Sequence, residues 1–321
     1  MAIYGQGSSI LEAPIKHLIL SAIAVLASGT AAHAQQQTAL QLWQPAEEYF
    51  DGGWVFTPSF SPDGQTAWVV HWADPLNLAE PQALYRLERE GGRWASPLKS
   101  DVAPNKLLDW PSVSPDGTTL FLSIAEWQVM NGQRIDDFDL YTIDLDDPVM
   151  TPRLITSSGV NTPKTPQNAT RGYAANETGP RLLADGTLVF WTERDGATGG
   201  RDIFFAAPNA EGGWLPPEEY PHNTVKRDSH PWLPVDDSYM LFASNRPGGY
   251  GRDDLYYSQR LSDGGWSEPC NLGPEINSAH DDNAPGIDPL TGALLFSSDR
   301  PLGGVDFYRV YEALLEGEYC E

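Results

Sequence analysis

A short segment recurs along this chain, and the repeat constrains the fold more than any other feature. Ser61-Pro62-Asp63-Gly64 returns as Ser114-Pro115-Asp116-Gly117 and, more loosely, as Ala184-Asp185-Gly186, Val235-Asp236-Asp237 and Ile287-Asp288-Pro289-Leu290-Thr291-Gly292. A proline stands five residues before the aspartate in the first four copies, and another opens the fifth: Pro58, Pro111, Pro180, Pro231 and Pro285. Self-similarity at a period of about 50 residues is typical of propellers and solenoids.

Each repeat predicts four short strands. Pro-Asp-Gly is a turn sequence, because proline presets φ, aspartate bonds nearby backbone and glycine accepts a positive φ. An apolar run follows the turn, as in Leu188-Val189-Phe190-Trp191, and an Asp-apolar-aromatic triplet begins at Asp139, Asp202, Asp254 and Asp306. A Gly-Trp element ends three of the repeats, at Trp94, Trp214 and Trp266. Four short antiparallel strands form one propeller blade.

The spacing predicts five blades. The steps between the blade-opening prolines are 53, 69, 51 and 54 residues, and the chain left over at the two ends makes up about one further period. Trp43-Gln44-Pro45 is a shortened form of the element that ends a blade. We therefore expect the N-terminal segment to supply the outer strand of the last blade and to close the ring, which removes free sheet edges. A sixth, degenerate blade is the alternative.

Composition agrees with an all-β fold. The 30 glycines and 27 prolines disfavour a helical protein, and the 11 Trp, 13 Tyr and 11 Phe argue against disorder. The formal net charge is −24, from 44 acidic and 20 basic residues. Such a field repels phosphate, so a nucleic-acid partner is excluded.

The N-terminus has the layout of a secretory signal. Lys16 and His17 precede the apolar run 18–26, which is followed by Ala32-His33-Ala34. A positive start, a short apolar core and an Ala-x-Ala site predict cleavage after Ala34, although a retained membrane anchor is the alternative. We expect a signal peptide over residues 1–34, one propeller domain over 35–321 without a transmembrane segment, and a periplasmic or secreted protein. Cys270 and Cys320 are the only cysteines, and export permits a disulfide between them; two free thiols are the alternative.

Several motifs of the fourth repeat resemble those of a known family. They are Ser244-Asn245-Arg246-Pro247-Gly248-Gly249, Asp254-Leu255-Tyr256, Gly264-Gly265-Trp266-Ser267-Glu268-Pro269 and Asn271-Leu272-Gly273-Pro274-Glu275-Ile276-Asn277. They look like the TolB-like, WD-repeat-like β-propeller family of bacterial envelope proteins. The resemblance covers essentially the whole mature chain and implies a propeller, but it does not imply an activity.

An acidic residue stands two or three positions before four of the blade-opening prolines: Asp109, Glu177, Asp228 and Asp282. Because the innermost strand of a blade starts here, these side chains are predicted to ring one mouth of the central channel. Such a ring attracts a divalent cation such as calcium, or a basic peptide. The alternative is that each acid binds local backbone at the turn between blades.

Arginines and histidines add two further hypotheses. Arg194, Arg246 and Arg300 precede Asp202, Asp254 and Asp306 by six to eight residues, which predicts structural Arg–Asp pairs across a hairpin. His230 and His280 lie near acids in neighbouring repeats, so a His/carboxylate metal site is a further hypothesis. Unrelated loop histidines are the alternative, because no His-x-x-x-His spacing is present.

Two functions remain open from the sequence. The first is a monomeric, non-catalytic scaffold of the bacterial envelope that needs no cofactor and binds a protein, peptide or glycan on one propeller face. The sequence contains no Gly-x-Ser-x-Gly elbow, in agreement with this interpretation. The second is a carbohydrate-active enzyme, a glycoside hydrolase or a metal-assisted lyase, that uses Glu177, Asp228 and Asp282.

Overall fold

The structure, a computed structural model, describes residues 40–50, 52–75, 82–130, 133–165, 175–301 and 308–314. The predicted signal peptide, Asp306 and Cys320 lie outside the described residues. Cys270 is disulfide-bonded. No helix of the described residues is long and apolar enough to cross a membrane.

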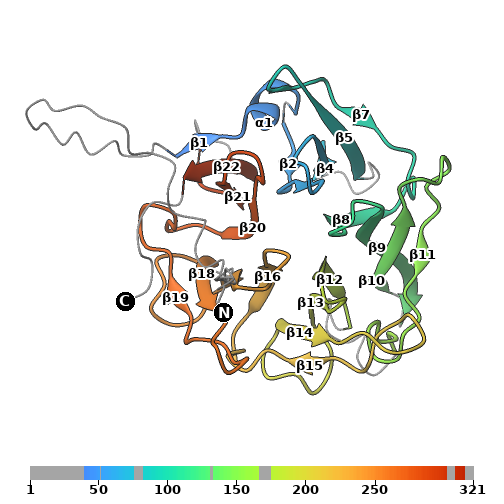
Figure 1. Ribbon diagram of the computed structural model, residues 1–321, viewed down its shortest axis with the longest axis vertical. Helices are drawn as coiled ribbons and strands as arrows, with labels where there is room; N and C mark the ends of the chain where they lie inside the picture. Colours follow the sequence, from blue (N-terminus) through green and yellow to red (C-terminus); the bar gives the residue numbers. More distant parts are fainter. Residues whose placement is uncertain are drawn as a thin grey trace, which may run out of the picture. The chain divides into compact units, whose positions relative to one another are not determined.

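Five antiparallel sheets surround a common axis and form a five-bladed β-propeller (Figure 1). The predicted fold class is thereby confirmed. Blade 1 contains β2 (Trp54–Val55), β3 (Ser59–Phe60), β4 (Thr66–Trp72), β5 (Ala83–Glu90), β6 (Arg93–Trp94) and β7 (Leu98–Lys99). Its inner edge is divided, because β2 and β3 both pair with β4.

The other four blades each have four strands, which run from the axis outward. Blade 2 contains β8 (Leu107–Val113), β9 (Thr119–Met130), β10 (Gln133–Asp144) and β11 (Arg153–Leu154). Blade 3 contains β12 (Glu177–Leu182), β13 (Leu188–Thr192), β14 (Asp202–Ala206) and β15 (Glu218–Glu219). Blade 4 contains β16 (Asp228–Trp232), β17 (Tyr239–Ser244), β18 (Asp254–Gln259) and β19 (Cys270–Asn271).

Blade 5 closes the ring with a strand from the other end of the chain. Its strands are β20 (Asp282–Ile287), β21 (Ala293–Ser298), β22 (Arg309–Leu314) and the N-terminal β1 (Gln41–Leu42). In Figure 1 the blue β1 lies beside the red β22, and Gln41 is paired with Glu312. The short helix α1 (Gln44–Glu48) follows, and the Trp43 amide donates to the Val310 carbonyl. The predicted closure by the N-terminal segment is confirmed.

In the described part of the chain the core forms five apolar clusters, one between each pair of neighbouring blades. The cluster between blades 5 and 1, for example, joins Leu295 and Val310 to Val55, Val69 and Leu87. The cluster between blades 3 and 4 joins Trp191 and Ile203 to Met240 and Phe242. Burial of each large apolar side chain there stabilises the folded state by about 1.5–3 kcal/mol. The interfaces between blades therefore hold the ring together.

The inner strands are interrupted at the recurring proline. Their pairing shifts register there in blades 2 to 5, for instance between Asp109 and Ser112. Proline lacks an N–H, so it suits the unpaired edge of a sheet. The residue before the proline has a positive φ in these blades: Trp110 (48°), Gly179 (67°), His230 (57°) and Ala284 (58°). This conformation is strained for a residue other than glycine.

We expect Gly179→Ala to destabilise the protein. A Cβ at Gly179 would lie 2.8 Å from Cδ1 of Trp191, and alanine would also adopt the left-handed conformation, at a combined cost of about 2–4 kcal/mol. The converse change at the equivalent position, Ala284→Gly, should alter the free energy of unfolding by less than about 1 kcal/mol. Chemical denaturation measures both variants. Equal stability of the two would contradict the strain at this position.

Candidate functional site

The acids three residues before the proline are buried inside their own blades. Glu177, Asp228 and Asp282 are each 0% exposed. Each accepts a backbone N–H from the preceding loop, from Thr162 (3.0 Å), Thr224 (2.6 Å) and Ser278 (2.6 Å) respectively. The predicted ring of acids around the channel mouth is therefore not formed by these three. Their carboxylates fix the start of the inner strand.

Each of these acids also pairs with the arginine that follows the second strand of its blade. Nη2 of Arg246 lies 2.6 Å from Asp228 Oδ1, Arg194 lies 3.4 Å from Glu177, and Arg300 bonds Asp282. The guanidinium of Arg246 also lies 5.0 Å from the ring centroids of both Phe242 and Tyr256. The cation is thus held between two rings of its own blade and points at the acid.

The predicted pairs Arg194–Asp202 and Arg246–Asp254 are wrong, and the partner of Arg300 is Asp282. In blade 4 the reason is the sheet register, because Ser244 is paired with Asp228 on one side and with Asp254 on the other. Arg246 bonds the Ser244 hydroxyl and turns toward the inner strand. Asp254 instead accepts the backbone N–H of Tyr250 at 2.5 Å. Hairpin spacing alone does not distinguish these two acids.

Asp109 differs from the other predicted acids, since it stands two residues before its proline. Its Oδ2 accepts a hydrogen bond of 3.3 Å from the Thr178 hydroxyl of the next blade. Its Oδ1 is buried and has no hydrogen-bond partner in the described part of the chain. Burial raises the pKa of Asp109 to about 7, against the smaller lowering effects of Thr178 and the Arg201 charge. The carboxyl is therefore part protonated at neutral pH.

A chain of aromatic contacts lies beside Asp109. Ring centroids are 5.4 Å apart for Tyr308 and Trp54, 6.5 Å for Trp54 and Phe56, and 6.2 Å for Phe56 and Trp110. Trp110 in turn lies 4.4 Å from His230, which belongs to blade 4. We call this set the aromatic arc. It joins blades 5, 1, 2 and 4 where the inner strands begin. We call this end of the axis the strand-start end.

His230 belongs to the aromatic arc. Its Nδ1 lies 3.0 Å from the Ser229 hydroxyl. Burial, together with the charges of Arg201 and Arg227, lowers the pKa of His230 well below its usual value, so the ring is neutral. His280 lies apart from it, with Nδ1 3.7 Å from Asp299. Among the described residues no three His, Cys, Asp or Glu side chains gather to hold a metal ion.

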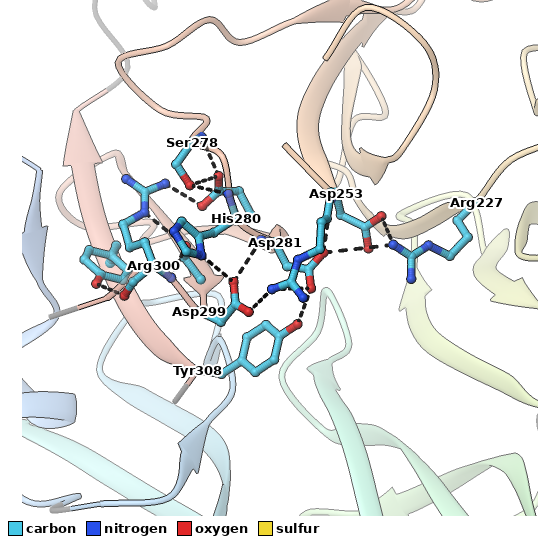
Figure 2. A network of polar contacts seen from close by, with 12 residues as sticks. Arg227, Asp253, Ser278, His280, Asp281, Asp299, Arg300 and Tyr308 are labelled. Atoms are coloured by element: carbon cyan, nitrogen blue, oxygen red, sulfur yellow. Dashed lines mark hydrogen bonds and ion pairs between the residues drawn. The ribbon is translucent and has the colours of Figure 1, made fainter. Parts of the chain in front are cut away.

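A network of charged groups extends over blades 4 and 5 at the strand-start end (Figure 2). Arg227 lies 2.7 Å from Asp253, whose backbone N–H donates to Asp281 at 3.1 Å. Asp281 also accepts the Tyr308 hydroxyl at 2.9 Å and lies 3.2 Å from Arg252. Figure 2 shows Asp281 between the Asp253–Arg227 pair and Tyr308. Tyr308 therefore joins this network to the aromatic arc.

Sequence reasoning missed most of this network and all of the arc except His230. The missed residues are Trp54, Phe56, Trp110, Arg201, Arg227, Arg252, Asp253, Asp299 and Tyr308. A signal was present, because a charged residue directly precedes the structural acid in Arg227-Asp228, Asp253-Asp254 and Asp281-Asp282. In a strand, neighbouring side chains point to opposite faces. The first residue of each pair therefore contacts the network, while the second is buried in its own blade.

Comparison with known proteins identifies the fold and no family. No protein-family model matches the sequence, and no curated protein matches it either. An endo-arabinase from Bacteroides thetaiotaomicron is similar in structure, with a TM-score of 0.50, 13% identity, and coverage of 84% of this chain and 99% of that chain. A xylan β-1,4-xylosidase from Bacillus halodurans has a TM-score of 0.50 and 17% identity over 83% of this chain and 53% of that one.

A third similar structure is a puromycin-hydrolyzing peptidase from Mycobacterium tuberculosis, with a TM-score of 0.40 and 16% identity. The match covers 77% of this chain but only 35% of the peptidase, so this chain spans about a third of that protein's length. At these identities the likeness shows the propeller fold alone. The resemblance to the TolB-like family stays a prediction.

The buried Arg–acid pairs should be important for stability. Arg246→Ala leaves the Asp228 carboxylate buried without its cation, so we expect a loss of about 3–5 kcal/mol in the free energy of unfolding. Arg86→Ala is the matched control, because Arg86 and Glu88 form an exposed pair, and it should cost less than about 1 kcal/mol. Urea denaturation of both variants gives the comparison. Similar losses for the two would show that the buried pair has no special role.

Proposed function

We propose that the protein binds a neutral glycan at the strand-start end of the axis and cleaves it with Asp109 as the proton donor. The observation that supports this most is the Asp109 carboxyl, whose pKa is raised to about 7 by burial and whose Oδ1 has no partner among the described residues. A carboxyl in this state can give a proton to the leaving oxygen of a glycosidic bond.

The neighbourhood of Asp109 suits a sugar. The aromatic arc offers the half-buried faces of Trp54 and Trp110, against which the C–H faces of a sugar ring pack. The network of Arg227, Asp253 and Asp281 supplies donors and acceptors for hydroxyl groups. A neutral glycan is preferred to an acidic one, because the chain has a net charge of −24.

Glycoside hydrolysis needs a second carboxylate, which acts as base or nucleophile. Two carboxyl groups beside the site are held by arginines. Arg201 donates from Nε to Glu193 at 2.8 Å, and Arg227 donates to Asp253 at 2.7 Å. Glu193, which is half-buried, would supply the second group, whereas Asp253 is only 2% exposed. The mechanism requires no cofactor. Glu177, Asp228 and Asp282 are not proposed for this role, because their bonds inside the blades leave them fully buried.

The two similar structures with a TM-score of 0.50 are named as an endo-arabinase and a xylan β-1,4-xylosidase, so pentose oligosaccharides are reasonable first probes. A non-catalytic scaffold is the second candidate. It is favoured because the three predicted catalytic acids, Glu177, Asp228 and Asp282, form hydrogen bonds inside their own blades. Under both proposals the protein is exported to the bacterial envelope or beyond.

Hydrolysis assays on arabino- and xylo-oligosaccharides, with reducing ends as the readout, test the proposal. We expect Asp109→Asn to lower kcat/KM by about 100-fold or more, because asparagine retains the shape but cannot donate the proton. Asp63→Asn, which changes an exposed carboxyl in the first Ser-Pro-Asp-Gly turn, should leave the rate unchanged.

An Asp109→Asn variant that hydrolyses at the wild-type rate would remove Asp109 from the mechanism. Wild-type protein that binds these oligosaccharides in calorimetry but does not cleave them would favour the non-catalytic scaffold.

A further inference from the structure

A cavity of about 310 Å³ lies on the axis and extends from Trp110 of the aromatic arc to the turns that follow the inner strands. All five blade-opening prolines line it, one from each blade. Trp110 and Trp232 add aromatic faces, and Arg181 is the one charged side chain among the described residues that line it. A cavity of this size and apolar character is in the range of small-molecule sites.

Arg181 has no counter-charge in this cavity. Its Nε donates to the Leu233 carbonyl at 2.8 Å, and its guanidinium lies 4.9 Å from the centroid of the Trp232 ring. In the part of the chain that the structure describes, its two terminal nitrogens have no hydrogen-bond acceptor and no carboxylate within ion-pair distance. Burial lowers the pKa of Arg181 to about 10, so the side chain is still a cation at neutral pH.

Neither Tyr239 nor the turn acids of blades 3 and 4 form an ion pair with Arg181. Burial raises the pKa of Tyr239 to about 12, so that phenol is uncharged. The turn acid of the same blade, Asp185, accepts bonds from the backbone and hydroxyl of Thr187, and Asp236 is bound in the same way by Ser238. Arg181 is half-buried, and a cation held there without a counter-charge among the described residues is available to an anionic ligand.

A second polar group of the cavity wall is also unsatisfied. Ser112 is 4% exposed, and its hydroxyl has no hydrogen-bond partner among the described residues. It stands directly after Pro111, as Arg181 stands directly after Pro180. The two residues therefore occupy equivalent positions on the inner strands of neighbouring blades. The cavity thus offers a cation and a hydroxyl donor against walls of proline and tryptophan.

We infer that this cavity binds a small organic acid with an apolar body, and that Arg181 receives its carboxylate. Proline rings and the Trp232 face would contact the apolar body, while the terminal nitrogens of Arg181 would donate to the two carboxylate oxygens. A compact monoanion suits the site better than a polyanion, because the net charge of the chain is −24. The cavity shares Trp110 with the aromatic arc, but Arg181 takes no part in the proposed hydrolysis.

Calorimetry with 3-phenylpropionate and with its amide tests the inference on the full chain. We expect the acid to bind with a Kd in the millimolar range or below, and the amide at least about tenfold more weakly. Arg181→Met should abolish binding of the acid, and Arg181→Lys should retain part of it. Thermal unfolding provides the folding control, because Arg181→Met keeps an apolar side chain against Trp232 and removes a half-buried cation that has no counter-charge among the described residues, so the midpoint should not fall by more than a few degrees.

Equal binding of acid and amide, undiminished binding by Arg181→Met, or no binding of the acid at about 10 mM would each overturn the inference. A second experiment distinguishes two possible ligands that carry a carboxylate, the C terminus of a peptide and a free organic acid. The tripeptide Gly-Gly-Phe with a free C terminus is compared with its amidated form. Tighter binding of the free tripeptide than of 3-phenylpropionate would identify the C terminus of a peptide as the source of the carboxylate. The reverse order would identify a free organic acid.

Discussion

The buried bond between an arginine and the acid at the start of the inner strand is the interaction on which the rest of the structure depends. It occurs as Arg194–Glu177, Arg246–Asp228 and Arg300–Asp282. Each acid also accepts a backbone N–H from the loop that arrives from the preceding blade. One carboxylate thus joins three pieces of chain and fixes where the inner strand begins. The positions of the residues that follow, including His230, are set by it.

The sequence was sufficient for the architecture, because propeller repeats are local. Each turn, strand and Gly-Trp element is determined by residues within about 50 positions, so the period predicts five blades and the leftover ends predict the closing strand. The pairing of β1 with β22 agrees with both predictions. The site could not be predicted to the same depth. Whether Arg246 meets Asp228 or Asp254 depends on which neighbouring strand each acid occupies, and spacing along the chain does not contain that information.

Departures from the repeat were more informative about the site than the repeat itself. Asp109 occupies the place that Thr178, Ser229 and Asn283 take in blades 3 to 5, and its Oδ1 has no hydrogen-bond partner among the described residues. Arg181 similarly takes the place of Ser59, Ser112 and Trp232. Positions that recur in every blade serve the scaffold, whereas a charged residue in one blade alone breaks the symmetry of the ring. The two proposed sites rest on two such residues, one toward each end of the axis.

The central claim of this account is that burial keeps Asp109 part protonated at neutral pH. Its pKa can be measured by a carboxyl ¹³C NMR titration of protein labelled at aspartate, with Asp109→Asn to assign the signal. The account predicts a midpoint near the value of about 7 that burial confers. A midpoint near the ordinary aspartate value of about 4 would mean that Asp109 is ionised throughout the physiological range. The carboxyl could not then serve as the proton donor, and the enzymatic proposal would be contradicted.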